Sequence, residues 1–388
     1  MLTFACGRTT HGDVDSGTDA PETLIVDADT DKLIDEGETG NVPSLWSPAH
    51  DMPTGRASHA SAFVGGWALV AGGTVTNIGT DSVDAYDPEA DSWKTTSPLT
   101  QPRYLACSTL LPSGTWFMAG GLLGSGYGAY AAGGAEAFDP ATMTWNVLPA
   151  MNGKRYEHAC AALPTGGVLA SGGMTQAGPF VQTGSAEVFD PLQGWTSTGS
   201  LSSTRVGHTA TTLGNGTVLV AGGATEAGVT TASAELYDAK TSSFVPTGSL
   251  SEHRAGHVAV LLGNGKLLVV GGGNQQILAS AELYDAKTGK WLPAGSMTVP
   301  RGLMTATLLA SGKVLVTGGY NETLADIASA ELYDPATNSW SPAGTMASGR
   351  AGHAAVLLPS GKVLVTGGNS TGQQFPVDSA ELFDESAL

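Results

Sequence analysis

The sequence is poor in basic residues, and this shortage limits the classes of partner. It contains 17 Lys and Arg against 35 Asp and Glu, so the formal net charge at pH 7 is −18. Nucleic acids and anionic membranes attract basic surfaces, because both are negatively charged. We therefore expect no nucleic acid partner and no direct binding of a membrane surface.

Long apolar runs and recognisable catalytic motifs are also missing. No stretch of 18 consecutive apolar residues occurs, so the sequence predicts no membrane-spanning helix. No phosphate-binding loop, Ser-His-Asp arrangement or pair of catalytic carboxylates stands out from the rest of the chain. The sequence therefore predicts a non-catalytic protein that needs no cofactor.

What the sequence does contain is one unit repeated seven times. The copy at residues 301–340 reads RGLMTATLLASGKVLVTGGYNETLADIASAELYDPATNSW. In it, TATLLA, KVLVTG and ASAELYD are patterned as strands, and the segment at Trp340 forms a fourth. A Gly-Gly pair and an Asp-Pro turn separate them, since glycine permits positive φ and Asp-Pro starts a turn. Each unit is predicted to be a four-stranded antiparallel meander.

The spacing of the Gly-Gly pair predicts the architecture. It recurs every 47 to 52 residues, at Gly72, Gly120, Gly172, Gly222, Gly271, Gly318 and Gly367. Four strands in a period near 50 are typical of a β-propeller blade. The order Arg-x-x-His, Gly-Gly, AELYDP and Trp resembles kelch repeats over residues 46–384, as in the central domain of galactose oxidase. We predict an all-β fold, a seven-bladed kelch-type propeller.

The two ends of the repeat region predict how the ring closes. The seventh unit stops at ELFD, residues 381–384, without a fourth strand of its own. Trp46 precedes Arg56 by ten residues, the spacing that separates every other fourth-strand aromatic from the next Arg. We therefore predict that the strand around Trp46 completes the last blade and leaves no free sheet edge. Residues 43–388 would form one propeller, which we expect to be a monomer.

The N-terminal segment, residues 1–42, has a different composition. It carries ten acidic residues against Arg8 and Lys32, which predicts a disordered acidic tether. Its start, MLTFACGR, resembles the end of a bacterial lipoprotein signal, which implies lipidation at Cys6 and attachment to the cell envelope. Thr3 stands where Leu is usual, and no charged and apolar stretch precedes it. Export without a lipid, and an intracellular protein with an ordinary Cys6, are the alternatives.

The same segment contains a calcium-loop-like spacing of acids. Positions 1, 3, 5, 9 and 12 of such a loop are occupied by Asp27, Asp29, Asp31, Asp35 and Glu38. Lys32 holds the sixth position, where the sharp turn requires glycine. A solvated acidic linker is the alternative interpretation.

The connections between second and third strands contain nearly all the variation in repeat length. In a meander they share a face with the connections from one blade to the next, and loops on a rigid scaffold commonly bind ligands. Their aromatic and amide side chains suit a sugar or an extended peptide. The candidate binding residues are Tyr127, Tyr130, Phe180, Asn274, Gln275, Gln276, Tyr320, Asn321, Glu322, Gln373, Gln374 and Phe375.

Two residue types recur once in every unit, and a group repeated seven times is expected to be structural. The arginines are Arg56, Arg103, Arg155, Arg205, Arg254, Arg301 and Arg350. The acids are Asp84, Glu136, Glu187, Glu235, Glu282, Glu331 and Glu381. We predict one ion pair per blade, because a buried charge requires a partner. Five histidines at equivalent positions are likewise interpreted as structural, so no metal site is predicted in the propeller.

Cys107 and Cys160 lie on the predicted first strands of adjacent units, four and five residues after the repeat arginine respectively. Their side chains therefore point to opposite faces of their sheets. Neighbouring blades pack opposite faces together, so the two sulfurs can meet between blades. Either a disulfide or two buried thiols is compatible with this placement.

The functional expectation is a binding module, displayed on the cell envelope, that holds a protein or a polysaccharide. The resemblance implies two enzymatic alternatives, a galactose oxidase-like copper oxidase and a sialic-acid epimerase-like enzyme. The oxidases use two tyrosines, two histidines and a Tyr-Cys crosslink, and neither Cys107 nor Cys160 has a matching setting. No residue of the chain maps specifically onto the epimerase.

Overall fold

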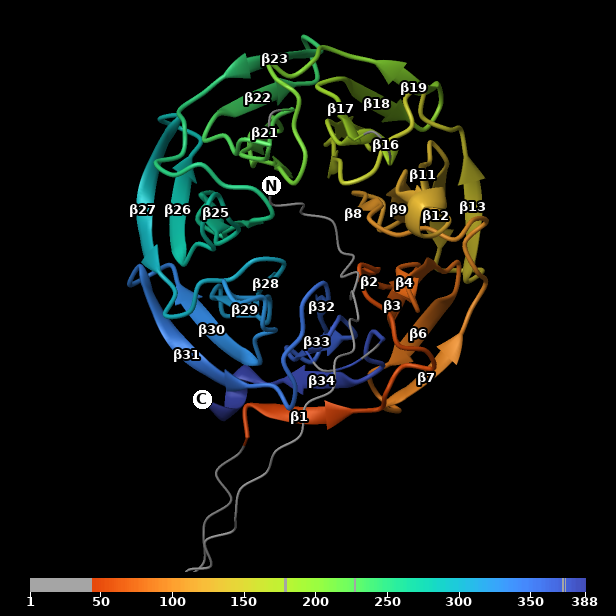
Figure 1. The fold of residues 1–388 in the computed structure, drawn as a ribbon, viewed down its shortest axis with the longest axis vertical. Coiled ribbons are helices and arrows are strands. Elements are labelled where there is room, and N and C mark those ends of the chain that lie inside the picture. The colour runs from red at the N-terminus through yellow and green to blue at the C-terminus, as the bar shows by residue number, and fades with distance from the viewer. Residues whose placement is uncertain (1–43, 178–179, 227, 372, 374) are drawn as a thin grey trace, which may run out of the picture.

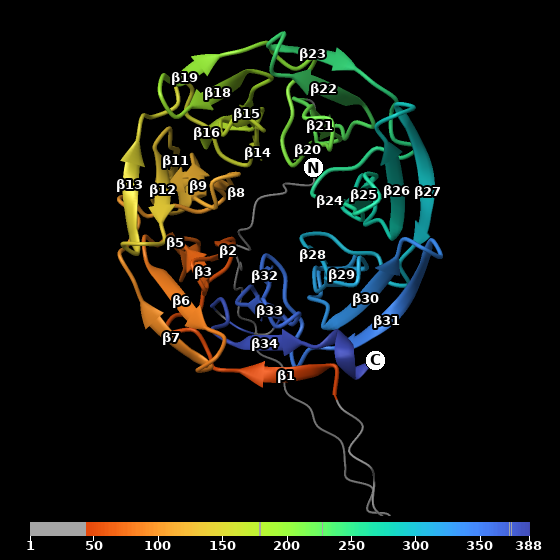
Figure 2. The same cartoon turned by 180° about the vertical axis from the view of Figure 1, so that it is seen from behind.

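Seven four-stranded antiparallel sheets surround a central axis like the blades of a propeller (Figure 1). The computed structural model describes residues 44–388 except 178, 179, 227, 372 and 374. Figure 2 shows the same closed ring from behind. The predicted all-β, seven-bladed fold is confirmed. The helices in the described part are the short η1 (Gly126–Gly128) and η2 (Glu385–Ala387), and none found there is long and apolar enough to cross a membrane.

Each blade is a meander whose first strand lies nearest the axis and whose fourth forms the rim (Figure 1). Blade 1 contains β2 (Ala60–Val64), β3 (Trp67–Ala71), β6 (Val83–Asp87) and β7 (Ser92–Thr95). Blade 2 contains β8 (Cys107–Leu110), β9 (Trp116–Ala119), β12 (Ala135–Asp139) and β13 (Thr144–Leu148). Blade 3 contains β14 (Ala159–Ala162), β15 (Val168–Ser171), β18 (Ala186–Asp190) and β19 (Gly194–Ser197).

The remaining blades follow the same order. Blade 4 contains β20 (Thr209–Thr212), β21 (Val218–Ala221), β22 (Ala234–Asp238) and β23 (Ser243–Pro246). Blade 5 contains β24 (Val258–Leu261), β25 (Leu267–Val270), β26 (Ser280–Asp285) and β27 (Lys290–Ser296). Blade 6 contains β28 (Thr305–Leu308), β29 (Val314–Thr317), β30 (Ser329–Asp334) and β31 (Ser339–Thr345). Blade 7 contains β32 (Ala354–Leu357), β33 (Val363–Thr366), β34 (Ala380–Phe383) and the N-terminal β1 (Trp46–Ala49).

The core lies between the blades. Second strands such as β21 and β29 are buried along their whole length, which explains their continuous VLV runs, since both faces pack on a neighbouring sheet. One cluster joins Leu219 and Ala221 of blade 4 to Leu267 and Val269 of blade 5. Stability therefore depends on contacts between neighbouring blades.

Strand β1 closes the ring as predicted. It pairs antiparallel with β34, with Trp46 opposite Phe383. Their ring centroids are 5.3 Å apart, and the Trp46 indole donates to the Ala343 carbonyl of blade 6 at 2.8 Å. Third and fourth strands form the same kind of aromatic pair in the other six blades, for example Tyr333 with Trp340. The first described strand thus completes the last blade.

The Gly-Gly pair joins each blade to the next. The Gly73 amide donates to the Arg103 carbonyl of blade 2 at 2.8 Å, and the equivalent bond forms at all seven junctions. A Cβ at Gly72 would lie 2.5 Å from that carbonyl oxygen, and its φ is +64°. Only glycine satisfies both requirements.

Short hairpins occupy three of the second-to-third connections, where the sequence analysis expected loops. They pair β4 (Thr74–Val75) with β5 (Ile78–Gly79), β10 (Leu122–Leu123) with β11 (Tyr130–Ala131), and β16 (Met174–Ala177) with β17 (Phe180–Gln182). Thr76 and Asn77, with φ of 51° and 63°, form the turn of the first hairpin. Runs of two to four residues are too short for a sequence pattern to reveal.

Candidate binding face

Each repeated arginine pairs with the acid of its own blade. The ion pairs include Arg103 with Glu136 at 2.7 Å and Arg205 with Glu235 at 2.6 Å. Pairs form in all seven blades, and both side chains are almost completely buried in each. The Nη1 atom of each guanidinium donates to carbonyls at the Gly-Gly pair and before the third strand, as from Arg205 to Gly222 and Ser233. None of the pairs crosses to a neighbouring blade.

The second carboxylate oxygen of the acid is also satisfied. Glu136 accepts the amide of Thr100 at 2.8 Å, so the carboxylate also binds the connection that enters the blade. In blade 1, Asp84 is one methylene shorter and accepts the Thr95 hydroxyl at 2.8 Å instead. Burial raises the pKa of Glu187, but amide hydrogen bonds and Arg155 outweigh it and hold that pKa below its ordinary value. Because these charges are fully paired, they support the scaffold and are not available to a ligand.

Four of the five repeat histidines bond to a hydroxyl of the preceding blade. Burial, followed by the neighbouring arginine, lowers the pKa of His208, His257 and His353 to about 3. These imidazoles are therefore neutral at physiological pH. His208 lies 3.2 Å from the Ser171 hydroxyl, and His257 lies 3.0 Å from that of Thr209.

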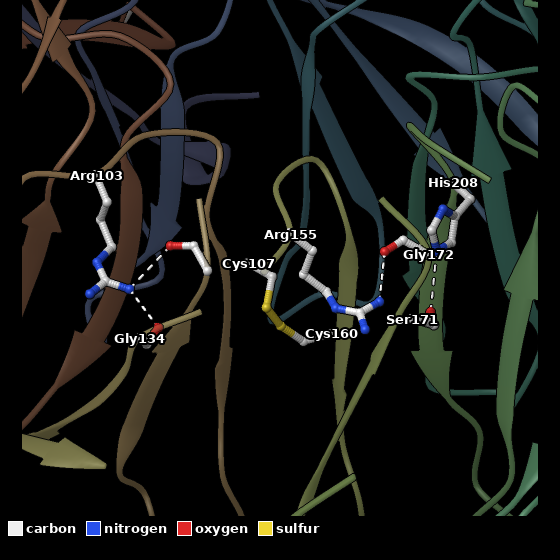
Figure 3. Close-up of a disulfide and its surroundings, with 9 residues drawn as sticks. Arg103, Cys107, Gly134, Arg155, Cys160, Ser171, Gly172 and His208 are labelled. Carbon is white, nitrogen blue, oxygen red and sulfur yellow. Dashed lines mark hydrogen bonds between the residues drawn. A yellow bond between two sulfur atoms is a disulfide. The ribbon is translucent and has the colours of Figure 1, made fainter. Parts of the chain in front are cut away.

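Cys107 and Cys160 are joined by a disulfide (Figure 3). Their Cα atoms are 5.7 Å apart, on the innermost strands β8 and β14. Of the two alternatives left open by the sequence, the structure has the bond. It links blade 2 to blade 3 across 53 residues.

The loop face, defined here as the seven second-to-third connections, lies on one side of the ring. They are residues 74–82, 122–134, 174–185, 224–233, 273–279, 320–328 and 369–379. In every blade one bridge pairs this connection with the residue after the repeat arginine, for example Ala57 with Thr74 and Tyr104 with Leu122. The connections between blades therefore lie on the same face.

The structure separates the predicted binding residues into groups. Tyr130, Gln275, Gln276, Glu322, Gln373 and Phe375 are exposed on the loop face. Asn274 and Asn321 are half-buried, and their side-chain oxygens accept amides of their own loops. The half-buried Tyr320 lies over Gly302, where a Cβ would come within 2.9 Å of its ring. Gln374 and the side chains of Tyr127 and Phe180 are outside the described part.

Exposed apolar side chains form a ring on the loop face. Six loops each present one large apolar residue with 40% to 57% of its surface exposed: Ile78, Tyr130, Val181, Val229, Leu324 and Phe375. Sequence analysis named Tyr130 and Phe375 and missed the other four. The sequence offered no clear signal for them, because the loops of Ile78 and Leu324 also contain the aliphatic residues Val75 and Ile327.

The charges of the loop face have one sign. Its seven connections contain no Lys or Arg, and they carry Asp81, Glu226, Glu322, Asp326 and Asp378. The turns on the opposite face contain five lysines, Lys240, Lys266, Lys287, Lys313 and Lys362. The connections between blades, on the same face, add one exposed lysine, Lys154, so the loop face is apolar and predominantly acidic.

A second ring surrounds the axis on this side of the molecule. The residue before the repeat histidine position has φ between 49° and 63° in all seven blades. Blades 4, 5 and 7 place glycine there, whereas the others place Ser58, Leu105, Glu157 and Leu303. Left-handed backbone disfavours these four residues by about 1 kcal/mol each. Backbone hydrogen bonds join neighbours in this ring, as from the Glu157 amide to the Leu105 carbonyl at 3.1 Å.

Glu157 is the one acid in that ring. The residue is half-buried, but its Oε1 atom is buried without a hydrogen-bond partner. Burial raises the pKa of Glu157 to about 8, so the carboxyl is mostly protonated at pH 7. Sequence analysis missed it, although alignment of the repeats places it where three blades have glycine.

The axis is hollow beside blades 1, 2, 6 and 7. A cavity of about 440 Å³ is lined mainly by strands β2, β8, β28 and β32. Another of about 250 Å³ lies at the level of Ser58, Leu105 and Leu303. Neither has a charged residue in its wall. These cavities offer apolar groups and hydroxyls to a small molecule.

Comparisons with known proteins agree with this architecture. The KLHDC2/KLHL20/DRC7 Kelch-repeats domain matches residues 194–384, and the Kelch motif matches residues 55–100. No curated protein sequence matches the chain. Among solved structures, a fungal alcohol oxidase of the AA5 family in complex with copper is similar, with a TM-score of 0.71 and 20% identity. The match covers 87% of this chain and 76% of the oxidase.

The blades, their Arg-acid pairs and the Gly-Gly junctions define a seven-bladed propeller. With the two family matches, the chain is a kelch-repeat β-propeller protein. The likeness to the oxidase shows a shared fold and carries no activity to this chain.

Proposed function

We propose that this propeller is a non-catalytic module that binds a protein partner on the loop face. The observation that carries the proposal is the ring of exposed apolar residues in six of the seven loops. Exposed apolar groups gathered on one face of a rigid scaffold mark interaction sites, because burying them against a partner is favourable.

The chemistry of the face specifies the partner further. A face with apolar anchors and exposed acids, whose second-to-third connections contain no Lys or Arg, complements a surface that carries apolar and basic groups. A polysaccharide remains the second ligand class, supported by the exposed Tyr130, Gln275, Gln276 and Gln373. The aliphatic members of the ring favour protein, since they offer a sugar neither stacking nor hydrogen bonds.

A capture experiment with two matched triple variants tests this proposal. The loop-face variant replaces Tyr130, Leu324 and Phe375 by Ser. The control replaces Val147, Val245 and Leu292 by Ser, because these residues are similarly exposed but lie on the rim strands. A partner from the source cell should be held by the native chain and the control, lost by the loop-face variant, and crosslinked to loop residues. Loss by the control alone, or equal capture by both variants, would refute the proposal.

We also propose that the chain is exported and anchored by a lipid at Cys6, with residues 1–42 as an acidic tether. The resemblance of MLTFACGR to a lipoprotein signal supports this proposal. Cys6 lies outside the described residues. Metabolic labelling with a fatty acid should mark the native chain and not a Cys6→Ser variant. Labelling of both would exclude Cys6 as the site.

A further inference from the structure

The repeat histidines occur where the preceding blade offers a side chain that can bond to the imidazole. His59 lies 3.1 Å from the Thr366 hydroxyl of blade 7, and His353 lies 3.0 Å from that of Thr317 in blade 6. His208 meets Ser171, and His257 meets Thr209. These hydroxyls come from two positions, the residue before the Gly-Gly pair and the first residue of the innermost strand.

Two blades lack the histidine, and both follow a blade without such a hydroxyl. Blade 2 has Ala106 at this position, and blade 1 offers only Ala60 and Ala71. Blade 6 has Met304, and blade 5 offers only Val258 and Val270. In these two blades the histidine and its hydroxyl partner are absent together.

His158 departs from this rule. Blade 2 presents Ala119 and Cys107 at the two partner positions, so no hydroxyl faces the imidazole. Both ring nitrogens of His158 are buried without a hydrogen-bond partner, whereas the other four repeat histidines have only Nδ1 unpartnered. An unpartnered buried polar group costs about 1 to 3 kcal/mol. The imidazole is therefore placed for a partner other than a hydroxyl.

The sulfurs are the candidates for that partner. Cys107 Sγ, Cys160 Sγ and a ring nitrogen of His158 all lie within 4.8 Å of one another. Among the residues that the structure describes, no other group of three His, Cys, Asp or Glu side chains gathers its ligand atoms in this way. Cys107 and His158 are buried and Cys160 is half-buried, so an ion can reach the site past Cys160.

We propose that, once the disulfide between Cys107 and Cys160 is reduced, both thiolates and His158 bind a divalent zinc ion. Two thiolates and one imidazole are a donor set that zinc accepts, with a water molecule at the fourth position. Zinc-sulfur bonds of about 2.3 Å separate two tetrahedral sulfur ligands by about 3.8 Å, which fits the observed grouping.

Charge selects a divalent ion over a monovalent one. Two thiolates and Zn²⁺ have zero net charge, whereas the same ligands around Cu⁺ leave one negative charge in a buried site. A phosphine reductant and water convert the disulfide into two thiols and a phosphine oxide. Binding of Zn²⁺ to the two thiols then releases two protons. Disulfide and zinc would thus link the same strands, β8 and β14, in oxidising and reducing conditions respectively.

Zinc titration of the full chain tests the inference. The metal-free protein is prepared oxidised or reduced with a phosphine, and Zn²⁺ is titrated against a chromophoric chelator. We expect one Zn²⁺ per reduced chain and none per oxidised chain. Co²⁺ in place of zinc should give a sulfur-to-cobalt charge-transfer band. His158→Asn should weaken binding about tenfold or more, whereas His208→Asn, which alters the same position in the next blade, should leave it unchanged.

Three results would overturn the proposal. They are equal zinc binding by the oxidised chain, unchanged affinity in His158→Asn, and binding of Cu⁺ without Zn²⁺. If His158→Asn does not fold, the cobalt spectra of the native chain and of Cys160→Ala decide. The charge-transfer band should be lost or roughly halved without Cys160, and an unchanged band would exclude the site.

Discussion

At the junctions between blades the same contacts recur seven times, whereas on the loop face no two blades carry the same loop. Each junction contains a Gly-Gly pair bonded to the next arginine carbonyl, and each blade contains a buried Arg-acid pair. The loops share their position, the bridge to the residue after the repeat arginine and, in six blades, one exposed apolar residue. The repeated junction residues form the scaffold, because a closed ring requires every junction. The variable loops are the candidates for ligand binding, because a ligand is recognised by particular side chains.

Departures from the repeat are therefore the informative positions. Cys107, Glu157 and Cys160 are three of them, and they lie in blades 2 and 3 together with His158, the repeat histidine that has no hydroxyl partner. None is part of the sevenfold pattern of contacts. This junction is where the scaffold is modified most.

The largest expected effect comes from removing the closing strand. Deletion of residues 43–52 should remove the partner of β34 and expose its edge, so the chain should unfold or oligomerise. Deletion of residues 1–42 alone is the control and should leave a folded monomer. Circular dichroism and light scattering distinguish these outcomes. A stable monomer after the first deletion would show that β1 is dispensable.

Breaking one buried ion pair should cost less, but still several kcal/mol. Glu235→Ala leaves Arg205 charged and buried, and we expect a loss of about 3 to 5 kcal/mol in the free energy of unfolding. Lys362→Ala breaks the exposed pair with Asp384, 3.2 Å apart, and should cost less than about 1 kcal/mol. Chemical denaturation measures both. Similar losses for the two variants would contradict the structural role of the repeat pairs.

Glu157 should make stability depend on pH. Its pKa is raised from 4.5 to about 8 in the folded protein, so the folded state binds the proton more tightly than the unfolded state. Stability should therefore fall as the pH rises from 4.5 through 8 and change no further above. Glu157→Gln should remove this fall and stabilise the protein at pH 9 by about 5 kcal/mol.

Glu157→Gly separates charge from backbone strain. Glycine relieves the left-handed conformation as well, so it should add about 1 kcal/mol to the effect of glutamine at every pH. Denaturation of the native chain and of both variants at pH 5 and pH 9 gives the six values needed. Parallel pH profiles for the native chain and the glutamine variant would exclude a buried carboxyl.

The smallest effect on stability is expected on the loop face. Replacing Tyr130, Leu324 and Phe375 by Ser should change the free energy of unfolding by less than about 0.5 kcal/mol per residue, because these side chains are exposed. Thermal unfolding of the purified variant measures this change. A large loss of stability would mean that these residues belong to the scaffold.

Prediction from sequence succeeded where a feature was periodic. Blade number, strand order and closure by Trp46 follow from the spacing of repeated residues along the chain. That spacing can be measured without knowing any contact in the folded protein. Predictions of binding residues were less complete, because each loop sequence occurs only once and cannot be compared with the other repeats. Asn321 illustrates this limit: an amide that appeared free for a ligand closes its own loop through Thr323 and Ala325.

The sequence by itself determined the ring, since a repeated pattern of apolar strands and glycines can bury its faces only by packing each copy on the next. Tertiary structure alone decided which side chains meet across the junctions. The bond between Cys107 and Cys160, the unpartnered imidazole of His158 and the buried carboxyl of Glu157 depend on distances between residues of separate blades. Hydrogen bonds and burial depend on distances of a few ångströms between side-chain atoms. The spacing of residues along the chain does not specify such distances between separate blades.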